Sequence, residues 1–213
     1  MRTIEGILRL GPVLPVVTLR DADQAVPLAQ ALAAGGVRAV EITLRTPAGL
    51  AAIAAVARHV PECLAGAGTV LSAEDLQRAA DAGAAFAVSP GATARLLAAA
   101  AAGSIPFLPG VASASELMAA QESGLSHFKL FPAAQVGGTG LLRALAGPFP
   151  TARFCPTGGI DPKSAPDYLA LPNVLCVGGS WLAPEALIAA GDFEAIERLA
   201  REAANLSKGS AAS

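Results

Sequence analysis

Two charged side chains lie where the sequence is otherwise apolar, and both have the chemistry to act on a carbonyl group. Lys129 lies between phenylalanine and leucine residues, and Glu41 lies in a second apolar segment. Burial removes water from a lysine ammonium group, which favours the neutral amine, and a neutral amine attacks carbonyl carbons to form imines. A carboxylate that faces this amine can accept and return protons. The alternatives are a solvated Lys129 on an edge strand and a structural ion pair between Glu41 and Arg38 or Arg45.

Glycine-rich segments indicate an anion-binding site. Segments 156–160 (PTGGI) and 177–181 (VGGSW) each lie at the end of a predicted strand. Glycines allow backbone N–H groups to approach phosphate oxygens, and Arg45 would add a cation. The segment 66–69 (GAGT) suits a carboxylate instead, through Thr69 and the neighbouring amide groups. These residues therefore predict a small-molecule substrate that carries a phosphate and a keto-acid carboxylate.

The elements that must position these residues alternate along the chain. Short β-branched apolar segments predict parallel strands that are buried on both faces, and longer Ala- and Leu-rich segments predict helices. The predicted strands are 13–18, 39–44, 64–68, 85–89, 105–108, 127–131, 152–156 and 174–177. The predicted helices are 22–34, 47–59, 73–82, 93–102, 114–123, 138–146, 162–170, 184–190 and one near 193–206.

About eight such units predict an α/β protein with a compact, closed (β/α)8 TIM barrel. We expect one domain over residues 1–206 and a flexible tail over residues 207–213. In a TIM barrel the active site lies at the C-terminal ends of the strands, where the polar segments fall. An open doubly wound sheet is the alternative. It calls for a glycine-rich turn after the first strand, and residues 17–21 contain no glycine.

The composition excludes several classes of protein. Charged residues make up 15% of the chain and its formal net charge is −2, so the basic surface of a nucleic-acid-binding protein is missing. Glu5, Arg9 and several prolines interrupt the N-terminal apolar residues, which argues against a signal peptide and a membrane helix. The three cysteines, far apart in sequence, predict reduced thiols in a cytoplasmic protein. Neither His59 nor His127 has other ligands at metal-binding spacing, so no metal site is expected.

Six motifs, in the same order, resemble those of a known enzyme family. They are EITLRT (41–46), GAGTVL (66–71), SPG (89–91), FKLFPA (128–133), PTGGI (156–160) and GGSW (178–181). Over roughly residues 10–205 the chain resembles the 2-keto-3-deoxy-6-phosphogluconate (KDPG) aldolases, also described as 4-hydroxy-2-oxoglutarate (KHG) aldolases. Ala134 departs from the family pattern, because many relatives carry glutamate at this position.

The resemblance implies a lyase that reversibly cleaves KDPG to pyruvate and D-glyceraldehyde 3-phosphate in the Entner–Doudoroff pathway. It implies a homotrimer that uses no cofactor and no metal. Lys129 would form the Schiff base and Glu41 would be the general acid and base. Arg45 and Thr69 would bind the pyruvate carboxylate, whereas the glycine pattern alone assigns Arg45 to the phosphate, and this difference stays open. The remaining implied binding residues are Pro90, Phe131 and Thr157 around the substrate and Gly158, Gly159, Gly179 and Ser180 around the phosphate.

Other functions stay open at the level of sequence. The same motifs fit an aldolase for KHG or for the C4 epimer of KDPG that derives from galactonate. A phosphosugar isomerase, epimerase or synthase would share the barrel and the phosphate-binding loops. A catalytically silent barrel that only binds phosphorylated metabolites would share them too. Lys129 favours the aldolase, because the other classes do not require an imine.

Overall fold

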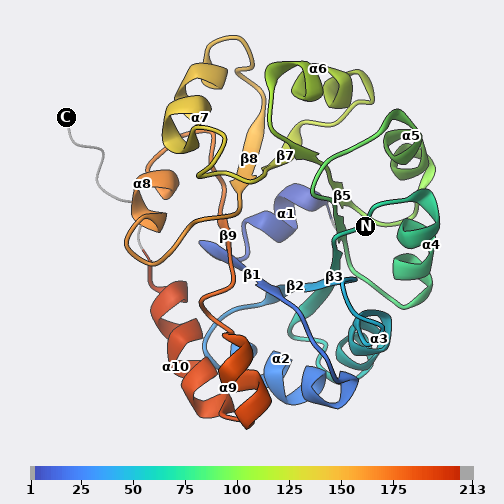
Figure 1. Ribbon diagram of the computed structural model, residues 1–213, viewed down its shortest axis with the longest axis vertical. Helices are drawn as coiled ribbons and strands as arrows, with labels where there is room; N and C mark the ends of the chain where they lie inside the picture. Colours follow the sequence, from blue (N-terminus) through green and yellow to red (C-terminus); the bar gives the residue numbers. More distant parts are fainter. Residues whose placement is uncertain (1–2, 207–213) are drawn as a thin grey trace.

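The computed structural model describes residues 3–206, in which strands and helices alternate as predicted (Figure 1). The expected tail at 207–213 lies outside the described residues. The strands are β1 (Val13–Val17), β2 (Ala39–Thr43), β3 (Leu64–Gly68), β4 (Ala87–Val88), β5 (Phe107–Leu108), β6 (Gly110–Val111), β7 (His127–Leu130), β8 (Arg153–Pro156) and β9 (Val177–Gly179). The helices are α1 (Ile4–Leu8), η1 (Ala22–Gln24), α2 (Ala25–Ala34), α3 (Gly49–His59), α4 (Ala73–Asp81), α5 (Ala94–Ala102), α6 (Ala114–Glu122), α7 (Gly138–Ala146), α8 (Ala165–Leu169), α9 (Glu185–Ala190) and α10 (Phe193–Ala204).

Several helices begin where the sequence places a capping side chain. The Ser72 hydroxyl accepts a hydrogen bond from the backbone N–H of Asp75 at 3.0 Å, which satisfies one of the free N–H groups at the start of α4. Thr93 and Ser113 do the same for α5 and α6. The sequence Thr46-Pro47 resembles a cap followed by the first residue of the helix predicted over 47–59, but the Thr46 hydroxyl instead donates to the carbonyl oxygen of Leu19, and α3 begins at Gly49. Thr46 therefore connects the loops after β1 and β2.

The expectation of one closed eight-stranded barrel is wrong. The strands form a six-stranded parallel half-barrel in the order β5-β4-β3-β2-β1-β9 and a separate three-stranded parallel sheet in the order β6-β7-β8. Pro109 lies between β5, which pairs with β4, and β6, which pairs with β7; it has no N–H to donate, and its carbonyl oxygen accepts a hydrogen bond from the backbone N–H of Lys129. On the other side, isolated bridges at Phe154–Val174 and Thr157–Gly178 are the pairing between the two sheets within residues 3–206.

Two clusters of apolar side chains lie on opposite faces of the strands. The larger one fills the space between the strands and the surrounding helices, and includes Val40, Ile42, Phe128 and Leu130. The smaller cluster lies on the inner face, where α1 packs against the strands (Figure 1). Its buried members are Ile7, Leu8, Leu14, Ala39, Phe86, Val88, Leu108, Cys155, Leu175 and Cys176. Because strand side chains alternate in direction, inner and outer residues alternate along β2 and β7.

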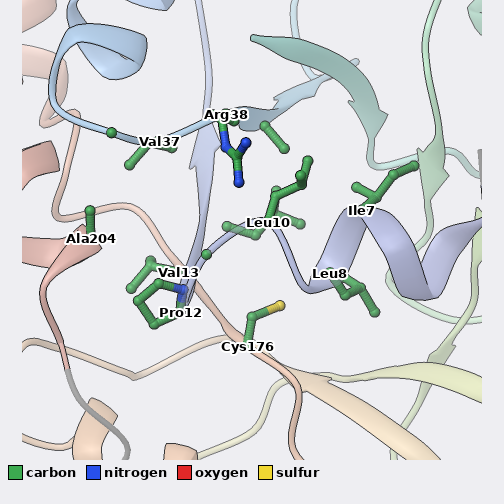
Figure 2. Close-up of a pocket in the computed structure, with 13 residues that line it drawn as sticks. Ile7, Leu8, Leu10, Pro12, Val13, Val37, Arg38, Cys176 and Ala204 are labelled. Atoms are coloured by element: carbon green, nitrogen blue, oxygen red, sulfur yellow. The ribbon is translucent and has the colours of Figure 1, made fainter. Parts of the chain in front are cut away.

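Helix α1 covers the N-terminal ends of the strands. Figure 2 shows Leu8 of this helix near Cys176, with Val13 at the start of β1 close by, and Ile7 lines the same cavity. The cavity that they line measures only ≈ 20 Å³, which is room for about one water molecule. The sequence did not predict α1, because five residues are too few for a helical apolar pattern. Among the described residues, no helix has the length and apolar character needed to span a bilayer.

Candidate active site

Lys129 and Glu41 meet inside the protein. The Nζ atom of Lys129 on β7 lies 3.0 Å from Oε1 and 3.3 Å from Oε2 of Glu41 on β2. Both residues are buried, with 5% of Lys129 and 1% of Glu41 exposed. Each of these buried charges requires the other as a partner, because an unpaired buried charge strongly destabilises the folded protein. The contact also rules out the two structural alternatives, in which Lys129 is solvated or Glu41 pairs with an arginine.

The strand registers place the two side chains on the same inner face. Glu41 pairs with Val16 and Gly66 on its neighbouring strands, and Lys129 pairs with Gly110 and Cys155. Cys155 belongs to the inner apolar cluster, so Lys129 stands at the same level of the interior as this side chain. Ala39 of the same cluster faces the interior two residues before Glu41, so apolar side chains lie both beside and below the charged pair.

Glycine at position 68 makes room for the carboxylate. A Cβ atom at Gly68 would overlap the Oε1 and Cγ atoms of Glu41, and a Cβ atom at Gly66 would overlap the ring of Phe86. Both glycines lie in β3, in the segment that the sequence assigned to a carboxylate of the substrate. Their lack of a side chain thus serves packing, because each accommodates an inner side chain from an adjacent strand.

A cavity of ≈ 350 Å³ opens on the C-terminal side of the charged pair. Phe131, two residues beyond Lys129, lines it, and the Lys129 Nζ atom lies 5.4 Å from the centre of the Phe131 ring. A cavity of this volume holds a small organic molecule. Its lining comprises Val16, Thr18, Arg45, Phe131, Thr157, Gly158, Gly159, Ile160, Gly178, Gly179, Ser180, Ala183, Pro184 and Glu185.

Arg45 connects this cavity to Thr69. Its Nε atom donates a hydrogen bond to the Thr69 hydroxyl at 3.1 Å. Thr69 has a φ of 59°, in the left-handed region that β-branched residues rarely adopt. Such a conformation costs on the order of 1–3 kcal/mol and is concentrated at functional sites. Arg45 thus lies between Thr69 and the glycine loops. It adjoins both positions to which the sequence analysis assigned an anion, the carboxylate at Thr69 and the phosphate at the glycine loops.

Thr157 lies at the bridge between the two sheets. It pairs with Gly178, and a Cβ atom at Gly178 would overlap the Thr157 hydroxyl. The Thr157 side chain is 7% exposed and its hydroxyl lies 3.4 Å from the carbonyl oxygen of Cys155. The glycine-rich segments around Gly158 and Gly178 therefore fix the Thr157 side chain against the cavity, besides leaving backbone N–H groups accessible.

The cavity unites most of the site residues predicted from the sequence. Arg45, Phe131, Thr157, Gly158, Gly159, Gly179 and Ser180 line it. Lys129, Glu41 and Thr69 are not in its lining: Lys129 adjoins it through the Phe131 ring, and Thr69 through its hydrogen bond with Arg45. Pro90 lies beside this group: a Cβ atom at Gly110, the partner of Lys129, would overlap the backbone of Pro90.

Two polar residues of the lining were missed by the sequence analysis. Thr18 follows β1, and Glu185 begins α9 and pairs with Arg20 at 3.5 Å. Thr18 is a polar residue at the C-terminal end of a strand, which was a usable signal. Glu185 had no comparable signal, because nothing in its local sequence places it near the other site residues.

The buried Cys176 thiol does not compete with Lys129 as a nucleophile. A hydrogen bond with Cys155, together with burial, raises the pKa of the Cys176 thiol well above its ordinary value. A thiol is nucleophilic as the thiolate, so a raised pKa makes Cys176 unreactive. Among the described residues, no group of three or more His, Cys, Asp or Glu side chains is arranged to hold a metal ion.

Fold and site together define the class of protein: an α/β protein in which a buried lysine amine lies beside a buried carboxylate on the inner face of parallel strands. Residues 4–199 match the model of the KDPG and KHG aldolase family. The chain belongs to this family, and it is a lyase.

Two relatives are about half identical to this chain over most of its length. The chain is 54% identical to the KHG/KDPG aldolase of Escherichia coli K12 over 199 residues, 93% of each protein. It is 52% identical to the 2-dehydro-3-deoxy-phosphogluconate aldolase of Dickeya dadantii, over 93% of each. A crystal structure of the Legionella pneumophila KDPG aldolase, with pyruvate captured as a covalent carbinolamine intermediate, superimposes with a TM-score of 0.93 at 45% identity. That superposition covers 94% of this chain and 98% of the other.

Proposed function

We propose that this protein is a class I aldolase that reversibly cleaves KDPG to pyruvate and D-glyceraldehyde 3-phosphate, with Lys129 as the Schiff-base residue. The observation that carries the proposal is the 3.0 Å contact between the Lys129 amine and the Glu41 carboxylate next to a substrate-sized cavity. Two relatives that are 54% and 52% identical to this chain are named as KDPG aldolases, which supports KDPG as the substrate.

The reaction begins with the transfer of a proton from the Lys129 ammonium group to Glu41. The neutral amine then attacks the C2 carbonyl carbon of the substrate and gives a carbinolamine. Glu41 returns its proton to the C2 hydroxyl, which leaves as water, and a protonated imine remains beside the Glu41 carboxylate. This sequence needs the carboxylate within hydrogen-bonding distance of the amine, and the two oxygens at 3.0 and 3.3 Å satisfy that requirement.

Cleavage uses the imine as an electron acceptor. Glu41 removes the proton from the C4 hydroxyl, the C3–C4 bond breaks, and its electron pair forms an enamine with the imine carbon. D-Glyceraldehyde 3-phosphate leaves with a new carbonyl at C4. Protonation of the enamine at C3, followed by addition of water to the imine, releases pyruvate and restores the Lys129 amine. The water lost on imine formation is thus regained, and no metal takes part.

The remaining cavity residues bind the two ends of the substrate in this proposal. Arg45 and Thr69, which are hydrogen-bonded to each other, bind the pyruvate carboxylate. The phosphate lies among the backbone N–H groups and the exposed hydroxyl of the glycine loops. The residues that bind it are Gly158, Gly159, Gly179 and Ser180, and Phe131 and Thr157 line the space between the two ends. Pro90 lies beside them, against Gly110.

A coupled assay tests the activity and the choice of substrate. Purified protein should release pyruvate from KDPG, measured by the oxidation of NADH with lactate dehydrogenase. KHG is a second candidate substrate, because the name of the E. coli relative includes it. The C4 epimer of KDPG, run under the same conditions, measures the stereochemical preference. A protein that released pyruvate from none of the three compounds would contradict the proposal.

We also propose that the enzyme works as a cytoplasmic homotrimer in the Entner–Doudoroff pathway. The cysteines Cys63, Cys155 and Cys176 are free and buried, which fits a reducing compartment. The trimer rests on the family resemblance. Light scattering after size exclusion should give three times the chain mass of 21.1 kDa. A mass equal to one chain would contradict the trimer and leave the chemistry at Lys129 unaffected.

A further inference from the structure

Two threonine hydroxyls meet in the layer of side chains next to the catalytic pair. The Oγ1 atoms of Thr18 and Thr43 lie 2.8 Å apart. The register pairs Val16 with Glu41, and Thr18 and Thr43 each follow two residues later in their chains. Because side chains two residues apart lie on the same face of a strand, this threonine pair stands on the cavity side of Glu41.

The count of hydroxyl protons gives this hydrogen bond a direction. Thr43 is completely buried, and Thr18 is its one side-chain hydrogen-bond partner within residues 3–206. Each hydroxyl has a single proton. If Thr18 donated to Thr43, the Thr43 proton would be buried without an acceptor, which is costly. Thr43 is therefore the donor and Thr18 the acceptor, and the Thr18 proton is left for another partner.

The Thr18 proton has the substrate cavity beside it. Thr18 is partly exposed and lines the ≈ 350 Å³ cavity together with the glycine loops and Ser180. Strand β1 runs beside β9, with Pro15 paired to Gly179, so Thr18 lies just beyond the loop proposed to hold phosphate. A hydroxyl that already accepts one hydrogen bond from a fixed neighbour is held in place as a donor.

We propose that Thr18 donates a hydrogen bond to an oxygen on the aldehyde half of the substrate, and that Thr43 is a positioning residue that acts through Thr18. The inference rests on the proposed aldolase function. Successive layers along a strand face are about 6.6 Å apart, because each residue rises about 3.3 Å. The keto-acid half is bonded to Lys129 at the level of Glu41, so a group one layer further meets the other half of the substrate. The acceptor is a hydroxyl or a phosphate oxygen.

Steady-state kinetics in the direction of aldol addition test this inference. Pyruvate is kept saturating, D-glyceraldehyde 3-phosphate is varied, and the wild type is compared with Thr18→Val, Thr18→Ser, Thr43→Val and the double variant Thr18→Val/Thr43→Val. The loss of one net hydrogen bond should raise the KM for the aldehyde by about three- to tenfold in Thr18→Val. Thr18→Ser retains the hydroxyl and should stay near the wild type. Thr151→Val, at an exposed loop position, makes the same chemical change as a control.

Thr43 is tested by non-additivity. Thr43→Val should raise the KM for the aldehyde when Thr18 is present and add nothing further in the double variant, because Thr43 acts through Thr18. A Thr43→Val effect of equal size in both backgrounds would mean that Thr43 only supports the local structure, and would overturn the positioning role.

Two further measurements separate the possible outcomes. D-Glyceraldehyde without phosphate repeats the comparison: a Thr18→Val penalty that persists identifies a hydroxyl acceptor, and one that disappears identifies the phosphate. An unchanged KM for both aldehydes in Thr18→Val would overturn the inference. Borohydride trapping of pyruvate by the wild type tests the aldolase function separately. Failure to trap would refute that function, whereas trapping with an unchanged Thr18→Val leaves it standing.

Discussion

The N-terminal and C-terminal ends of the parallel strands differ in both shape and polarity. At the N-terminal end, α1 closes the interior over apolar side chains and leaves a cavity of ≈ 20 Å³. At the C-terminal end, a cavity of ≈ 350 Å³ is lined by glycines, hydroxyls and charged side chains. On β2 the change from apolar to polar side chains occurs within two residues, because Ala39, Glu41 and Thr43 in succession face the interior.

This arrangement separates stability from chemistry along the same strands. The apolar end stabilises the fold through burial of apolar surface. At the polar end, the buried ion pair and the strained backbone of Thr69 each lower the stability of the fold. The apolar side chains beside and below the charged pair fix the position of the amine, which a preorganised site requires. Substitutions at the two ends should therefore affect different measurements.

Substitution of Glu41 by glutamine should have the largest effect on turnover. Glutamine keeps the size of the side chain and one acceptor but cannot transfer the proton, and this transfer contributes typically ~10²–10⁴-fold. We expect kcat for KDPG to fall by that factor with a much smaller change in KM. A large rise in KM at constant kcat would instead mean that Glu41 is only an ion-pair partner of Lys129.

Substitution of Phe86 by alanine tests the apolar end. Phe86 is fully buried in the inner cluster and its ring lies over Gly66. Loss of the ring leaves a cavity and should lower the free energy of unfolding by about 3–5 kcal/mol, measured by urea denaturation. At a temperature where the variant is folded, kcat/KM should stay within a few-fold of the wild type. A collapse of kcat in the folded variant would show that the two ends are not separable.

Substitution of Gly68 by alanine should displace the Glu41 carboxylate without removing it. The new methyl group would overlap the Glu41 carboxylate, and a misplacement of about 1 Å can cost about 10²-fold in rate. We expect that loss in kcat for Gly68→Ala. Gly140→Ala is the matched control, since Gly140 is exposed in α7 and a Cβ atom there has no neighbour within 4 Å. Equal activity of both variants would contradict the packing role of Gly68.

His127 at the start of β7 should give the smallest effect. Burial, opposed by the charge of Glu5, lowers the pKa of His127, so the folded protein binds fewer protons than the unfolded chain. Stability that His127 contributes is present above the unfolded pKa of about 6.5 and is lost as the pH falls toward the lower folded pKa. Urea midpoints between pH 7.5 and 5 should fall less steeply in His127→Gln. An unchanged or steeper pH dependence in this variant would remove His127 as the cause.

The local elements were predictable from sequence because their signals are local. The apolar segment 64–68 predicted the bounds of β3 correctly. The helix predicted from residue 73 begins there, directly after its capping residue Ser72. The division of the strands into two sheets was not predictable in the same way, since it depends on backbone pairing between distant segments. The sequence predicts one strand over 105–108, whereas in the structure β5 pairs with β4 and, one residue later, β6 pairs with β7.

Charged residues in apolar strands revealed the centre of the site but not its full extent. Lys129 and Glu41 stood out because burial of either one alone would be costly. Thr43 did not, because a threonine in a strand is ordinary, and its pairing with Thr18 appears only with the register of β1 and β2. Glu185 reaches the cavity through the position of α9, which no local pattern encodes.

The most direct test of the account is to locate the covalent adduct with pyruvate. The protein is treated with pyruvate and sodium borohydride, digested, and examined by peptide mass spectrometry, with Lys129→Arg as the control that retains the charge beside Glu41 but cannot form an imine. We predict an irreversible adduct on the wild-type peptide that contains Lys129, and none in the variant. An adduct on Lys163 or Lys208, or an adduct in Lys129→Arg, would contradict the assignment of Lys129 as the nucleophile.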